Sequence, residues 1–105
     1  MRALASSLRE GLTAHLAAVT TRIPAASAVL QLDEPSLPVV LAGHVPTPSG
    51  YGAVAAVDPV VVADALRDVL GAASPGARVV HCCAADVPIA LLHAAGADAV
   101  SVSYT

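Results

Sequence analysis

Three short runs rich in apolar residues constrain the fold of this chain more than any other feature of its sequence. They lie near residues 27–33, 78–83 and 98–103, and each has the length of a β-strand. A strand that is apolar along its whole length is typical of a parallel sheet, in which both faces are covered. Amphipathic segments separate the runs. The alternation therefore predicts an α/β fold with parallel strands and right-handed crossovers.

Helices are expected before the first run and between the first two. Asp58, followed by a proline, is an N-cap signal for a helix over about 58–73, and a shorter helix is expected over 36–43. Asp64 and Asp68 lie mostly off the buried face of the longer helix, so we expect them to be solvated. The segment before the first run places its apolar residues three or four positions apart, which predicts one buried helical stripe: Leu4, Leu8, Leu12, Leu16 and Val19.

The remaining connections carry turn and helix-start signals. Asp86 and Pro88 are interpreted as an N-cap and a first-turn proline, and Gly96 is expected to end that helix. Residues 44–52 contain two prolines and two glycines, a composition typical of a binding loop or a lid. Tyr51 in this loop can stack on a ligand or cover the core.

Composition narrows the class of protein. The 105 residues are enough for one domain, residues 1–105, and a net charge of −3 without a single lysine predicts no nucleic-acid partner. Prolines or charges interrupt every apolar run well before ~18 residues, so no membrane span is expected. The amino-terminal segment lacks a signal-peptide pattern, and two adjacent cysteines cannot form an ordinary disulfide with each other. We therefore expect a cytoplasmic protein with reduced thiols.

The second run ends in His81, Cys82 and Cys83, the residues with the richest chemistry in the chain. Side chains alternate along a strand, so His81 and Cys83 are expected on one face and Cys82 on the other. An imidazole and a thiolate on one face form half of a zinc site. Asp33 and Glu34 follow the first run and are expected at the same sheet edge. Asp33 can pair with a substrate ammonium group, whereas Glu34 suits a functional or a structural role equally.

Three motifs occur in order along the chain: QLDEPSL at residues 31–37, HCC at 81–83 and ADAVSV at 97–102. Together they resemble the C-terminal catalytic barrel of cobalamin-independent methionine synthases and their shorter relatives. The resemblance covers most of the chain from about Ala28. It implies a partial (β/α)8 TIM barrel of the methionine synthase/uroporphyrinogen decarboxylase-like type. It also implies a zinc-dependent methyltransferase of methionine biosynthesis, which transfers a methyl group from a methyltetrahydrofolate-type donor to the homocysteine thiol.

Carried over residue by residue, the resemblance implies that His81 and Cys83 bind zinc and that Asp33 contacts the amino group of homocysteine or methionine. We assign Glu34, beside Asp33, to substrate binding as well, and we assign no catalytic residue. Ser103 occupies the position of an acidic zinc ligand, as a degenerate metal position, and a further cysteine ligand would lie beyond the last residue. A (β/α)8 barrel needs roughly 250 residues. We therefore expect a piece of such a barrel with an incomplete zinc site, inactive alone and prone to self-association through exposed sheet edges.

The alternative hypothesis is a catalytically inactive α/β domain or interaction module whose cysteines are structural core residues. Cysteine is among the most buried residue types, and Cys82 at least is expected to pack against helices. Under this hypothesis both thiols are unreactive and zinc leaves the melting temperature unchanged.

Overall fold

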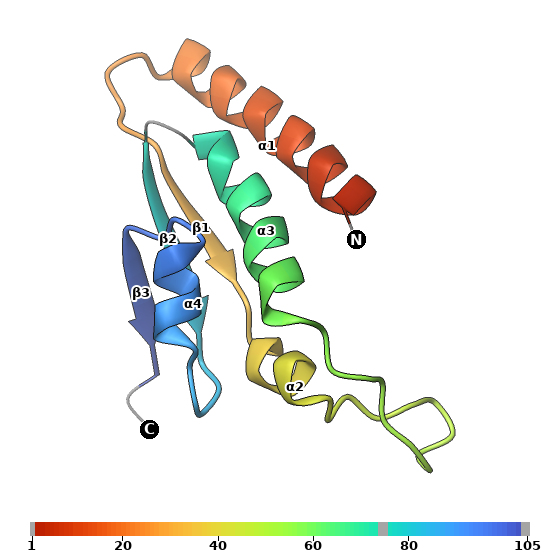
Figure 1. Ribbon diagram of the computed structural model, residues 1–105. Coiled ribbons are helices and arrows are strands. Elements are labelled where there is room, and N and C mark those ends of the chain that lie inside the picture. Colours follow the sequence, from red (N-terminus) through yellow and green to blue (C-terminus); the bar gives the residue numbers. More distant parts are fainter. Residues whose placement is uncertain (1, 74–75, 104–105) are drawn as a thin grey trace.

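The computed structural model describes residues 2–73 and 76–103, which form a three-stranded sheet with helices packed against it (Figure 1). In chain order the elements are α1 (Arg2–Arg22), β1 (Val29–Asp33), α2 (Leu37–Ala42), α3 (Pro59–Leu70), the 3₁₀ helix η1 (Gly71–Ala73), β2 (Ala77–Cys82), α4 (Ile89–Ala94) and β3 (Ala99–Val102). The α/β class and the three strands are confirmed, and each strand begins and ends within two residues of the predicted limits. None of the helices among the described residues is long and apolar enough to cross a membrane.

The sheet is parallel throughout, with β2 between β1 and β3. Its register places Asp33 beside His81, and His81 beside Ser101. The amide of Glu34 donates to the carbonyl of His81 at 2.8 Å, so the backbone pairing continues one residue past β1. The carboxyl ends of the three strands therefore meet at one edge of the sheet.

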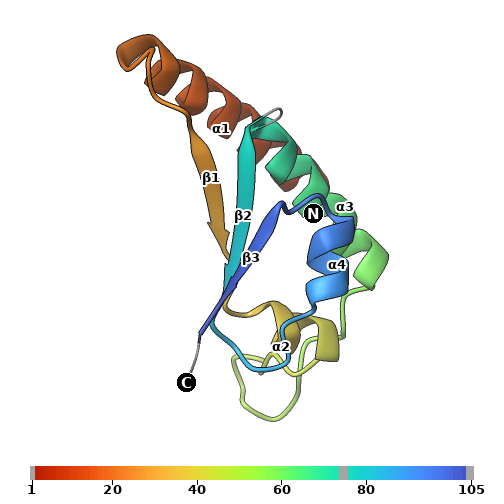
Figure 2. The ribbon, with the colours of Figure 1, turned by 90° about the vertical axis from the view of Figure 1, so that its left-hand side faces the viewer.

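The core lies between one face of the sheet and the helices α3 and α4, which lie on the same side of the strands (Figure 2). Its most completely buried side chains come from α3, β2 and α4: Leu70, Val80, Cys82 and Leu92. Burying a side chain of this size stabilises a fold by about 1.5–3 kcal/mol. This face is consequently what holds the sheet and the two helices together.

The opposite face of the sheet, which we call the open face, is not covered by any described element. Val29 is 60% exposed on it, and Gln31 and Asp33 are exposed as well. The expectation that both faces of the strands are covered is therefore wrong for the described residues. The reason lies in the sequence pattern: the positions that face the helices are mainly apolar, as at Leu30, Val80 and Val100, and polar side chains occupy several of the alternate positions.

Helix α1 packs against α3 and η1 rather than against the sheet (Figure 1). Leu12 and Leu16 of the predicted stripe are partly buried against the core, but Leu4 is 75% exposed and Leu8 is exposed too. Ala5 is buried in their place. The amino-terminal half of the predicted stripe is thus wrong, because a small residue lies where α1 meets α3.

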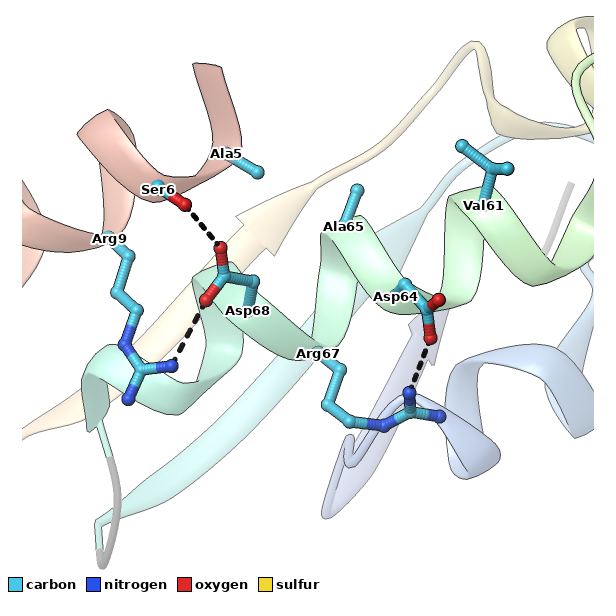
Figure 3. A pocket seen from close by; sticks show the side chains of 8 residues that line it. All are labelled: Ala5, Ser6, Arg9, Val61, Asp64, Ala65, Arg67 and Asp68. Carbon is cyan, nitrogen blue, oxygen red and sulfur yellow. Dashed lines mark hydrogen bonds and ion pairs between the residues drawn. The ribbon is translucent and has the colours of Figure 1, made fainter. Parts of the chain in front are cut away.

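Polar side chains also join α1 to α3 where Ala5 is buried (Figure 3). Ser6 Oγ donates to Asp68 Oδ2 at 3.2 Å, and Arg9 Nη1 donates to Asp68 Oδ1 at 3.0 Å. Asp68 was expected to be solvated, and it instead joins α3 to α1. Asp64 is exposed as expected and pairs with Arg67 on its own helix at 2.8 Å.

Local sequence signals correctly predicted the end of α2 and the start of α3, but they failed at the start of α4. Gly43 ends α2 with φ of 72°, and Asp58 Oδ1 accepts from the amide of Val60 at 2.8 Å at the start of α3. At α4, however, Pro88 is the N-cap residue and no side chain caps the helix. Asp86 lies two residues further back with φ of 58°, in the left-handed region that aspartate tolerates, so its predicted capping role is wrong.

The segment between α2 and α3 projects from the rest of the chain (Figure 1). Pro46 and Ala53 form an antiparallel bridge, so this loop is folded as a small hairpin. Tyr51 at its tip is 98% exposed, which makes the expectation that it covers the core wrong. The sequence Ser74-Pro75-Gly76 predicts a turn before β2, but Ser74 and Pro75 lie outside the described residues.

Candidate functional site

Four polar side chains gather on the open face near the carboxyl ends of the strands. We call Gln31, Asp33, His81 and Ser101 the polar cluster. His81 Nδ1 and Ser101 Oγ are 2.9 Å apart in a part-buried hydrogen bond between β2 and β3. On β1, Gln31 Nε2 donates to Asp33 Oδ1 at 2.8 Å. The period of two along each strand places all four on the same face, and the parallel register aligns them across it.

The two cysteines at the end of β2 have opposite environments. Cys82 is fully buried among the core residues, whereas Cys83, the first residue after the strand, is exposed. The difference agrees with the predicted alternation of side chains. It leaves Cys83 as the thiol that a ligand can reach from solvent.

Glu34 lies at the junction of β1 and α2 and is half-buried. Burial and, to a smaller extent, the charge of Asp33 raise the pKa of the Glu34 carboxyl above its ordinary value. Its backbone carbonyl accepts from the amide of Leu37 at 3.4 Å at the start of α2. Glu34 therefore has a structural role through its backbone, and its carboxyl keeps a proton to a higher pH than an exposed glutamate does.

Ser103 follows β3 by one residue and is exposed. The serine that contacts His81 is Ser101, two positions earlier, which was not among the predicted site residues. Side chains alternate along a strand, so Ser101 and Ser103 are expected on the same face. This alternation could have named Ser101 as a second candidate. Only the register between β2 and β3 decides which serine lies beside the histidine.

Among residues 2–73 and 76–103, the histidine, cysteine, aspartate and glutamate side chains form no group of three that could hold a metal ion. His81 and Cys83 are donors of the kind that zinc prefers, but a catalytic zinc site takes three protein ligands. The described donors thus fit zinc in kind and not in number.

Two hollows lie near these elements. One, of about 590 Å³, is formed by α2 and by the loop that follows Cys83, and His44 and Asp86 are the titratable groups that line it. The other, of about 450 Å³, lies between α1 and α3 (Figure 3). Its charged groups pair within the chain, Arg9 with Asp68 and Arg67 with Asp64. No residue of the polar cluster lines either hollow.

Comparison with protein-family models, with curated proteins and with solved structures finds no match.

Proposed function

We propose that the chain contributes the His81 and Cys83 ligands to a zinc-dependent methyl-transfer site of the cobalamin-independent methionine synthase type. The acceptor is homocysteine, the product is methionine and the methyl donor is of the methyltetrahydrofolate type. One observation carries the proposal: Asp33 and His81 share a register position at the carboxyl edge of a parallel sheet, and the exposed Cys83 is the first residue after β2.

The layout of the sheet supports a place in a larger (β/α)8 barrel. In such a barrel the helices cover the outside of the strands, and active-site residues come from the carboxyl ends of the strands. The helices α3 and α4 cover one face here, while the polar cluster occupies the other. Under the proposal the open face is the inner face of the barrel, and further strands beside β1 and β3 complete it.

Each polar residue then has a defined task. Asp33, whose exposed carboxylate accepts a hydrogen bond from Gln31, pairs with the ammonium group of the amino-acid substrate. Glu34 lies beside it in the chain. His81 and Cys83 are the residues that would hold zinc, together with donors from outside the described residues. Zinc, when bound, lowers the pKa of a coordinated thiol so that the sulfur is a nucleophile near neutral pH.

The complete burial of Cys82 favours the alternative hypothesis, an inactive α/β domain with structural cysteines, for that one residue. Cys83 separates the two hypotheses. A core cysteine gains stability from burial, and an exposed cysteine at a sheet edge does not. The exposure of Cys83 therefore supports the methyl-transfer proposal.

The proposal is tested by measuring the melting temperature of the whole chain with zinc alone, with homocysteine alone and with both. Two protein ligands leave positions for the substrate sulfur, so we expect the largest increase when both are present. The increase should disappear in His81→Ala and Cys83→Ser. A matched control is His93→Ala, which removes an exposed histidine of α4. An increase that survives Cys83→Ser would show that the proposal is wrong.

A further inference from the structure

We infer that Ser101 is a positioning residue for His81: its hydroxyl accepts a hydrogen bond from Nδ1–H of the ring and leaves Nε2 with a free lone pair. The observation behind it is the distance of 2.9 Å between Nδ1 and Oγ in a part-buried contact. The inference deepens the proposed function and rests on it for its purpose, because Nε2 is then the nitrogen of His81 that is free to bind a ligand.

The backbone fixes this contact in place. His81 and Ser101 are register partners, with Val80 beside Val100 before them and Cys82 beside Val102 after them. The pair therefore lies inside a ladder of hydrogen bonds, and a serine has only a single side-chain torsion to order. Partial burial also reduces the competition from water for the same hydrogen bond.

The position of the ring proton follows from the surroundings of the ring. A neutral imidazole has one donor nitrogen and one acceptor nitrogen, and the partner of one nitrogen decides the state of the other. If Nε2 carried the proton, the carboxylate of Asp33, the register partner of His81 on the other side, would be its natural acceptor. No bond from the ring to Asp33 is seen among the described residues: Asp33 Oδ1 accepts from Gln31, and Ser101 is the hydrogen-bond partner of the His81 ring. The inference accordingly places the proton on Nδ1, with the Ser101 hydroxyl as its acceptor.

Ser103 provides a control within the same strand region. It has the same parity as Ser101 and is exposed, but the register of β2 with β3 ends at Val102, before Ser103 is reached. A hydroxyl in this position has no histidine beside it in the ladder. Any effect seen at Ser101 and absent at Ser103 therefore belongs to the contact and not to the loss of a serine in general.

The experiment is nitrogen-15 NMR of the histidine side chains, with the tautomer of His81 determined for its neutral ring. We expect His81 in the unmodified chain to carry its proton on Nδ1. In Ser101→Ala the ratio of this tautomer to the other should fall roughly fivefold, the factor to which an ordinary neutral hydrogen bond corresponds. Ser101→Thr keeps the hydroxyl and should restore the ratio, and Ser103→Ala should leave it unchanged.

A proton on Nε2 in the unmodified chain would overturn the inference, and this measurement needs no variant to fold. An unchanged ratio in a folded Ser101→Ala would overturn it as well. Neither result involves zinc or homocysteine. Failure here is therefore distinguishable from failure of the methyl-transfer proposal, which the melting experiment decides.

Discussion

Cys82 and Cys83 are neighbours in the chain, yet Cys82 is fully buried beneath the helices and Cys83 is exposed just past the end of β2. The cause is the alternation of side chains at the end of a strand that has only one covered face. Two chemically identical thiols are thereby given different access to solvent.

We predict that a maleimide reagent labels one thiol per chain quickly in the native protein and both thiols in denaturant. Cys83→Ser should abolish the fast phase, because the remaining thiol of Cys82 becomes accessible only when the core opens. Mass spectrometry of the labelled chain measures the stoichiometry. Equal and slow labelling of both thiols would instead support the inactive domain with structural cysteines.

Glu34 predicts a dependence of stability on pH. Burial, and next to it the charge of Asp33, raises the pKa of Glu34 above its ordinary value of 4.5, so the folded state binds its proton more tightly than the unfolded state does. The stabilising contribution is fully present below pH 4.5 and is lost as the pH rises through the folded pKa. Glu34→Gln cannot ionise and should escape this loss.

Urea unfolding of the unmodified chain and of Glu34→Gln at a series of pH values tests this prediction. The free energy of unfolding of the variant, relative to the unmodified chain, should rise across that window and then become constant. Asp33→Asn removes the neighbouring charge and should narrow the window. A difference that does not change with pH would contradict the assignment.

Asp98 predicts a pH dependence of stability that is opposite in sign to that of Glu34. Its carboxylate accepts from Arg78 twice, from the side-chain Nε at 3.3 Å and from the backbone amide at 2.9 Å. The side-chain bond first, and then the backbone bond, lowers the pKa of Asp98 below its ordinary value of 3.8. The resulting stability is present above pH 3.8 and is lost as the pH falls through the folded pKa.

Acid unfolding of Asp98→Asn should therefore show a shallower loss of stability than that of the unmodified chain. The carboxylate is exposed, so salt should weaken the difference by screening. Circular dichroism during acid titration, at low and at high salt, measures both effects. If both proteins lose stability equally as the pH falls, the hydrogen bonds between Arg78 and Asp98 contribute nothing to the free energy of unfolding.

Gly43 and Gly11 form a matched pair for a test of backbone conformation. Gly43 has φ of 72°, and a Cβ added there would lie 3.0 Å from the backbone nitrogen of Ala56. We expect Gly43→Ala to lower the free energy of unfolding by about 1–2 kcal/mol. Gly11 lies within α1 with open space around it, so Gly11→Ala should raise stability by up to about 1 kcal/mol. Denaturant midpoints at unchanged slope measure both, and a neutral Gly43→Ala would contradict the left-handed end of α2.

The sequence predicted those features whose causes are local. The strands follow from short apolar runs, and the start of α3 follows from Asp58 and the proline after it, which act within one turn of helix. The end of α2 at Gly43 depends on one residue that adopts positive φ without strain. In each case the determining residues are neighbours in the chain.

The features that sequence reasoning missed depend on contacts between distant segments. Leu4 was expected to be buried because it continues a helical stripe, but Ser6 and Arg9 bind Asp68 and turn another face of α1 toward α3. Ser101 was missed for the same reason, since its importance arises from a register that no single strand encodes. Tertiary pairing decides such positions, and periodicity alone cannot supply it.

The open face predicts self-association. β1 and β3 are the edges of the described sheet, and Val29 is an exposed apolar residue on an edge strand. Unpaired edges and an uncovered face favour contact with a second copy, so we expect the mean mass from light scattering to rise with protein concentration. Val29→Lys should reduce the association, because a charge on an edge strand opposes edge-to-edge pairing.

Val60→Lys is the control for this prediction, since Val60 is 67% exposed on α3, away from the sheet edge. It adds the same charge to the chain and should leave the association unchanged. If both variants reduce the mass equally, net charge and not the sheet edge controls assembly. A monomer at every concentration would mean that the polar cluster and the short strands already prevent pairing. That result would contradict the prediction of self-association.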